Sequence, residues 1–159
     1  MKTQCHNPYL PLWEHIPDGE PHVFEDRLYV FGSHDLENGN EFCEQDYVSW
    51  SAPLDDLSDW HYEGVIYRKD QDPYNVNVLP LYAPDVVQGR DGRYYLYYCI
   101  KFQDSINVAV CDTPAGQYEF YGRVQYKDGQ AMMENQTYDP SVICTEEGNF
   151  LYFGFAPCM

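Results

Sequence analysis

The chain has 159 residues and a formal net charge of -17, with 26 acidic residues against nine Lys and Arg. This balance argues against nucleic acid or an anionic membrane as a partner, because phosphate binding needs clustered basic side chains; a neutral ligand such as a sugar remains compatible with it. Charged residues make up only 22% of the chain and aromatic residues 17%, which excludes a disordered polyanion and predicts one folded domain over residues 1–159.

The composition predicts an all-β protein. The chain has 16 Tyr, which favours strands, and 11 Gly with 11 Pro, which supply turns. The six cysteines include no pair with metal-site spacing such as C-x-x-C. The N-terminus has no apolar run typical of a signal peptide, and no stretch reaches membrane-spanning length. We therefore expect a reduced, cytoplasmic setting.

The first group of predicted strands follows an acid-rich turn. Asp18 and Glu20 precede a hairpin formed by residues 23–24 and 28–31, which ends in the sequence Gly-Ser-His-Asp at positions 32–35. Two further strands are expected at residues 47–51 and 60–67. A polar connection over residues 68–80 closes the group.

The pattern then repeats. A second group is expected at residues 86–87, 93–100, 107–111 and 118–126, and a third begins at 142–144 and 150–153. Pro-x-Val opens each group, at residues 21–23, 84–86 and 140–142. Four-stranded units recurring at roughly 50–60 residues are typical of propeller blades. Because closure typically needs at least four blades, about two and a half blades predict either a fragment or a chain completed by association.

Acids lie at matching places in the three groups. Asp18 (or Glu20), Asp85 and Asp139 precede or begin the first strands, which line the axis of a propeller, so their carboxyl groups are expected to converge. Converging carboxylates push their pKa values apart, as acid–base chemistry requires. The alternative is ordinary turn chemistry, in which Asp caps strand ends. Other candidate ligand contacts on this face are His34, Asp35 and the aromatic Tyr82.

These motifs together resemble the N-terminal half of a glycoside hydrolase family 43 enzyme, a five-bladed β-propeller. The matching features follow one another along nearly the whole chain: Asp18 and residues 33–35, the run Asp-Leu-Ser-Asp-Trp at 56–60, Ala-Pro-Asp-Val at 83–86, and Asp-Pro-Ser-Val at 139–142. The resemblance implies hydrolysis of arabinosides and xylosides with inversion. It also implies a general-base Asp in the first blade, an Asp that tunes the acid's pKa in the third blade, and a Glu general acid from a later blade.

The resemblance places Asp139 in the tuning role, but it leaves two candidates for the base. Counting back without gaps from residues 32–35 gives Asp18, whereas aligning on Pro-x-Val gives Glu20. The two positions differ by two residues, so both side chains could face the same side of a strand. We favour Asp18, because the longer Glu side chain would displace the water that the base must activate.

The Glu general acid has no identified counterpart in these 159 residues, so we expect the isolated chain to be inactive. Family members often hold Ca²⁺ in the central channel; since no ligands for it are identifiable, neither a metal site nor a cofactor is predicted here. The expected substrate is an oligosaccharide or a polysaccharide side chain. The competing interpretations are a non-catalytic carbohydrate-binding propeller piece and a remnant.

Overall fold

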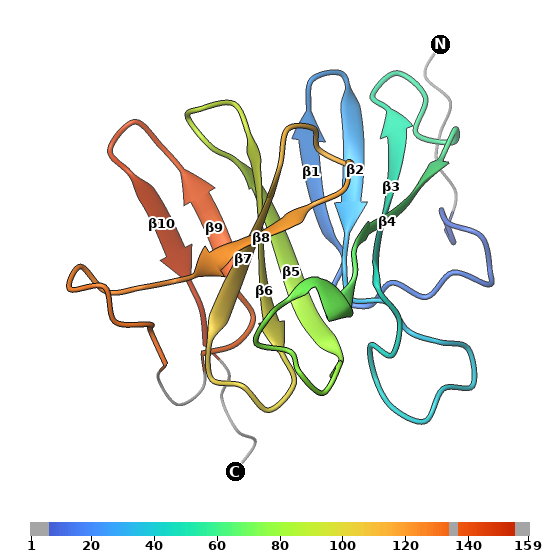
Figure 1. Cartoon of the computed structure of the whole chain (residues 1–159). Helices are drawn as coiled ribbons and strands as arrows, with labels where there is room; N and C mark the ends of the chain where they lie inside the picture. Colours follow the sequence, from blue (N-terminus) through green and yellow to red (C-terminus); the bar gives the residue numbers. More distant parts are fainter. Residues whose placement is uncertain (1–6, 134–136, 155–159) are drawn as a thin grey trace.

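The computed structural model describes residues 7–133 and 137–154 and confirms the all-β prediction. Three antiparallel sheets stand side by side in Figure 1, and we call them blades I, II and III. Blade I comprises β1 (Glu20–Phe24), β2 (Arg27–Phe31), β3 (Tyr47–Pro53) and β4 (His61–Tyr67). Blade II comprises β5 (Leu81–Gln88), β6 (Tyr94–Ile100), β7 (Ile106–Cys111) and β8 (Glu119–Arg123). Blade III has two strands, β9 (Ser141–Cys144) and β10 (Asn149–Tyr152).

Alternating side chains explain how the blades pack. In β6 the side chains of Tyr94, Leu96 and Tyr98 are buried and point to one face of blade II. They join buried residues of blade I, such as Phe31, in one hydrophobic cluster. Phe24 of blade I meets the Tyr94 ring edge to face, with 4.9 Å between the centroids. Blades I and II therefore share a core.

The predicted strands differ from the observed ones mainly at their ends. β5 begins at Leu81, five residues before the predicted start, and carries an irregularity between Tyr82 and Asp85. The hairpin tip of blade I holds Glu25 in the left-handed region, at φ +55°. One 3₁₀ turn, η1 (Lys69–Gln71), lies in the connection between blades I and II.

This connection is fixed by buried polar side chains. The Asn75 amide donates to the carbonyls of Lys69 and Leu79, and its own oxygen accepts from the Leu79 N–H. The Asp72 carboxylate, 3% exposed, accepts a 2.5 Å hydrogen bond from the Tyr98 hydroxyl. The loop thus holds the two blades at a fixed spacing.

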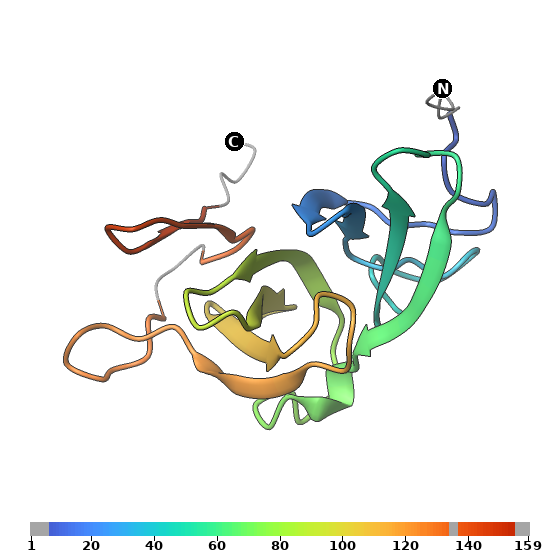
Figure 2. The ribbon, with the colours of Figure 1, turned by 90° about the horizontal axis from the view of Figure 1, so that it is seen from above.

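The first strands of the three blades are neighbours. β5 packs against β1 on one side and β9 on the other, and the view from above shows blade II between the other two (Figure 2). The segments that lead into these strands are consequently brought together. Among the described residues, no helix has the length and apolar character needed to span a membrane, and Cys43, Cys99, Cys111 and Cys144 are free thiols.

Candidate functional site

Each blade has a residue with a left-handed backbone conformation at or near its start. Asp18 lies two residues before β1 with φ +54°, and Asp139 lies two residues before β9 with φ +50°. In blade II the corresponding conformation occurs at Ala83, with φ +39°. Left-handed backbone costs energy for non-glycine residues, although Asp tolerates it better than most. Asp18 and Asp139 thus share both this conformation and their place two residues before a first strand, and both residues are exposed.

Ser33 joins two of these entrances. Its hydroxyl donates to Asp18 Oδ2 over 3.3 Å and accepts from the Ala83 N–H over 2.8 Å, and the side chain is fully buried. The preceding Gly32 lets the chain before Asp18 pass close by, since a Cβ there would lie 2.3 Å from the side chain of Ile16. Ser33 thereby anchors the predicted base to blade II.

The charge of Asp18 affects Asp139. The pKa of Asp139 is raised above its usual value, first by desolvation and then by the negative charge of Asp18. The pKa of Tyr82 is raised by burial and by the neighbouring Cys43 and Tyr138. Tyr82 is half-buried and therefore partly open to a ligand.

Cys43 lies beneath the same site. Burial, with the charges of Asp35 and Asp18 added, raises the pKa of its thiol to about 11, although a hydrogen bond with Ser33 opposes this. Cys99 is fully buried, and the pKa of its thiol is raised to about 12 by burial, against a backbone hydrogen bond from Asp139. Both thiols are therefore protonated at neutral pH and act as packing groups.

Glu20 occupies a different setting from Asp18. It is the first residue of β1, paired with Phe31, and its side chain is exposed. It does not share the left-handed conformation of Asp139. This geometry favours Asp18 over Glu20 as the counterpart of Asp139, while their chemical roles remain predictions.

His34 and Asp35 are bound to other parts of the chain. His34 is 9% exposed; its Nε2 lies 2.8 Å from Glu14 Oε1, and its Nδ1 lies 2.9 Å from the Asp46 carbonyl oxygen. Asp35 Oδ1 accepts from the Cys43 N–H over 2.7 Å. These contacts shape the loop after β2, which differs from the open substrate contacts expected from the sequence.

Glu14 was missed by the sequence interpretation. Its carboxylate is buried and contacts both His34 and the Trp50 indole N–H, the latter over 2.8 Å. No local sequence pattern predicts these two contacts of Glu14, because both partners lie at least 20 residues away in the chain.

Asp85 is buried, whereas the sequence analysis expected it among the residues that face the ligand. It is 1% exposed, and both carboxylate oxygens have partners within the protein. Oδ1 lies 2.6 Å from His22 Nε2 of β1, and Oδ2 accepts from the Val142 N–H of β9 over 2.5 Å. The sequence interpretation was misled because Asp85 lies at a strand entrance like Asp139, whereas the irregularity in β5 turns its carboxylate into the protein.

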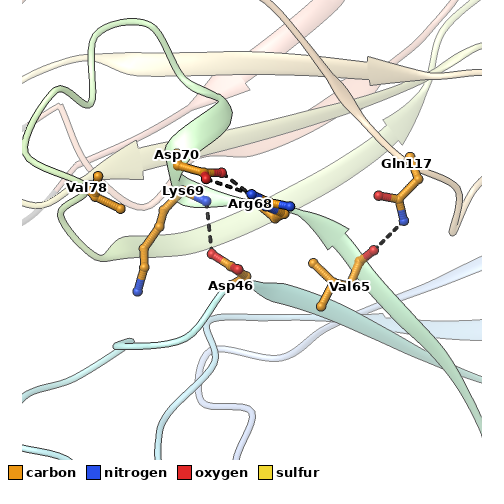
Figure 3. Close-up of a pocket in the computed structure, with 7 residues that line it drawn as sticks. All are labelled: Asp46, Val65, Arg68, Lys69, Asp70, Val78 and Gln117. Atoms are coloured by element: carbon orange, nitrogen blue, oxygen red, sulfur yellow. Dashed lines mark hydrogen bonds and ion pairs between the residues drawn. The ribbon is translucent and has the colours of Figure 1, made fainter.

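A separate hollow lies away from these acids. About 540 Å³ in volume, it is lined by the seven residues shown in Figure 3, which are Asp46, Val65, Arg68, Lys69, Asp70, Val78 and Gln117. Its polar groups bond to one another: Gln117 donates to the Val65 carbonyl, and Asp70 pairs with Arg68. It contains neither Asp18 nor Asp139, so we do not assign it as the active site.

No metal centre is evident in the described part of the chain. Within residues 7–133 and 137–154, no group of three or more His, Cys, Asp or Glu side chains is arranged to hold an ion.

Comparisons with known proteins point to one family. The family model described as glycosyl hydrolases family 43 matches residues 22–156. A xylosidase/arabinosidase of Thermoclostridium stercorarium is 57% identical over 162 residues, covering 99% of this chain and 34% of the relative. The xylosidase/arabinosidase 43A of Humicola insolens is 31% identical, covering 91% of this chain and 45% of its own.

Solved structures of xylose-bound and xylosidase proteins superpose on this chain. The GH43_1 enzyme from Xanthomonas citri, in a complex with xylose, superposes with a TM-score of 0.70 at 28% identity, over 92% of this chain and 41% of that one. The RS223 β-xylosidase gives a TM-score of 0.68 at 28% identity, over 89% and 44%. The chain thus spans between a third and a half of the length of these proteins.

Proposed function

The chain belongs to family 43 of the glycosyl hydrolases, and from this membership we propose that it forms the part of a glycosidase propeller that carries the general base and the pKa-tuning acid. In this proposal Asp18 is the base and Asp139 the tuning residue. The reaction is hydrolysis of xylosides or arabinosides with inversion at the anomeric carbon. The substrate class is supported by the names of the relatives, which are xylosidases and arabinosidases.

The observation that carries the proposal is the shared backbone conformation and electrostatic interaction of Asp18 and Asp139. Both stand at blade entrances in the same backbone conformation, and the charge of Asp18 raises the pKa of Asp139. A surface Asp that merely caps a turn needs no such partner from a segment 121 positions away in the sequence. Carboxyl groups whose environments differ in this way are typical of acid–base sites.

The chemistry divides among the carboxyl groups. Ionised Asp18, held by the Ser33 hydroxyl, would take a proton from the water that attacks the anomeric carbon. Asp139 would orient the general acid and adjust its pKa through its own charge. The acid is assigned to no residue of these 159. In inverting enzymes the acid and the base stand about 6.5–9.5 Å apart, which leaves room for the attacking water.

A chimera tests the proposal. The matching segment of the Thermoclostridium stercorarium relative is replaced by this chain, which is possible because 99% of the chain aligns at 57% identity. The chimera is expected to release 4-nitrophenol from an aryl β-xyloside or α-arabinofuranoside, and ¹H NMR is expected to show the inverted anomer first. Appearance of the retained anomer, or a folded but inactive chimera, would contradict the proposal.

Matched variants of the chimera test the assigned residues. Asp18→Asn and Asp139→Asn are each expected to lower kcat/KM by about 10²–10⁴-fold. Glu20→Gln, two residues from Asp18 and likewise exposed, is the control and is expected to change kcat/KM by less than about tenfold. The non-catalytic alternative predicts that the chimera binds xylotriose but turns it over only at the background rate. Its Asp18→Asn and Asp139→Asn variants would then show the same background rate.

A further inference from the structure

We propose that Asp85 is a positioning residue whose single carboxylate holds the blade I and blade III strands behind Asp18 and Asp139 in fixed relative places. This inference rests on the proposed function, which assigns the roles of Asp18 and Asp139. It adds Asp85 as a residue that positions these two acids without touching the substrate. The Asp85 carboxylate, on blade II, contacts residues of both blade I and blade III.

The contact is buried and uses both oxygens. His22 Nε2 of β1 lies 2.6 Å from Oδ1, and the Val142 N–H of β9 donates to Oδ2 over 2.5 Å, while Asp85 itself belongs to β5. The Asp85 side chain is 2% exposed and that of His22 28%. One side chain therefore connects all three blades within the protein, where hydrogen bonds to a charged group are strongest.

The two partners lie just behind the two predicted catalytic positions. His22 follows Asp18 by four residues, and Val142 follows Asp139 by three. Each acid stands at the start of a short strand, so fixing the strand three or four residues farther along limits how far the acid can move. Since blade III has only two described strands and β9 meets β5, the Val142 contact is a direct polar link between blades II and III.

The surroundings of His22 keep its ring in place. The ring stacks on Phe24, with centroids 5.8 Å apart and planes inclined by 14°, and lies 6.3 Å from the Phe31 ring. Neutral or protonated, His22 can donate from Nε2 to Asp85. Tyr97 of β6 is paired with Asp85 of β5, and its pKa is raised by burial first, with the charges of Tyr95, Cys144 and Asp85 adding to this.

Two substitutions of Asp85 are expected to have different effects on these contacts. Asp85→Asn retains one oxygen for the Val142 N–H and offers an NH₂ group to His22 Nε2, which can accept in the other neutral tautomer. Asp85→Ala removes both contacts and leaves the Val142 N–H without its acceptor. A positioning role predicts that the Asn variant rescues what the Ala variant loses.

The test uses the 159-residue chain and reads the electrostatic coupling between Asp18 and Asp139. The side-chain carboxyl of Asp139 is titrated by NMR, with and without Asp18→Asn, in the wild-type, Asp85→Asn and Asp85→Ala backgrounds. The fall in the Asp139 pKa caused by Asp18→Asn is expected to be kept in the Asn background and largely lost in the Ala background. An equal fall in all three backgrounds would overturn the proposal.

Two further variants separate positioning from general stability. Asp72→Ala removes another buried carboxylate, which bonds to Tyr98 between the blades, and is expected to destabilise the chain while leaving the coupling unchanged. If Asp85→Ala does not fold, His22→Phe removes the β1 contact alone and is expected to reduce the coupling partly. Loss of coupling in Asp72→Ala, or full coupling in His22→Phe, would count against Asp85. The titration needs no turnover, so its result is independent of the activity assay. The Asp85 proposal can be overturned while the chimera is active, and it can be supported while the chimera is inactive.

Discussion

Asp18 and Asp139 begin different blades yet adopt the same left-handed backbone conformation, at φ +54° and +50°. The charge of the first also raises the pKa of the second. Non-glycine residues in this conformation store strain that persists where the surrounding structure imposes it. The relationship therefore links two positions that are far apart in sequence and that the proposed mechanism uses together.

The raised pKa of Asp139 makes its ionisation unfavourable to the fold. Its carboxyl binds a proton more tightly when folded than when unfolded, so stability relative to Asp139→Asn is full below the usual value of 3.8 and falls as pH rises through the folded pKa. Urea unfolding between pH 3 and pH 7 is expected to show the Asn variant gaining stability over the wild type with rising pH.

Asp70→Asn provides a control of opposite sign. Arg68 lowers the pKa of the exposed Asp70 by a hydrogen bond, so the wild type is expected to gain on this variant as pH rises. The explanation would be wrong if the two variants followed the same pH trend.

The Ser33 hydroxyl is expected to matter more than that of another fully buried serine. Ser33→Ala removes the acceptor for the Ala83 N–H and the donor to Asp18, with an expected loss of about 1–3 kcal/mol. Ser49→Ala removes one 3.3 Å bond to the Val30 carbonyl, with an expected loss of about 0.5–1.5 kcal/mol. Chemical denaturation measures both, and a larger loss at Ser49 would contradict this ranking.

The Tyr98 hydroxyl is expected to stabilise the junction of blades I and II. It donates to the buried Asp72 carboxylate over 2.5 Å and lies 2.8 Å from the Tyr67 hydroxyl. Tyr98→Phe is expected to cost about 1.5–3 kcal/mol, the range for hydrogen bonds to charged groups. Tyr118→Phe loses only a bond to the neutral Pro114 carbonyl and should cost about 0.5–1.5 kcal/mol, so equal losses in thermal unfolding would refute the distinction.

The buried thiols are expected to resist alkylation. Cys43 and Cys99 are 3% and 0% exposed, and burial raises their pKa values to about 11 and 12. Iodoacetamide at pH 8 followed by peptide mass spectrometry should leave both unmodified in the folded chain and modify both in urea. Rapid labelling of Cys43 without denaturant would show that the loop after β2 opens.

Local sequence patterns predicted the blades because each strand alternates or buries its apolar residues within a few positions. The Tyr-rich stretch of β6 and the turn at residues 89–92 are examples. The same patterns could not show that β5 starts at Leu81, since the irregularity beside Asp85 depends on its pairing with β6.

The candidate site was predicted less completely than the fold. Asp18 and Asp139 were proposed because they recur before first strands, but Asp85 recurs in the same way and is buried between His22 and Val142. Its partners lie 63 and 57 residues away, so no spacing rule could reveal them. Ser33 belonged to a recognised motif, yet its bond to the Ala83 N–H became visible only when blades I and II were placed together.

The most direct test of the central claim is the titration of the Asp139 carboxyl in the wild type, in Asp18→Asn and in Glu20→Gln. Asp18→Asn is expected to lower the Asp139 pKa toward its usual value without reaching it, because desolvation remains the larger cause. Glu20→Gln is expected to leave that pKa unchanged. An Asp139 pKa that ignores Asp18, or that falls further on loss of the Glu20 charge, would contradict the assignment of Asp18 and Asp139 to one site.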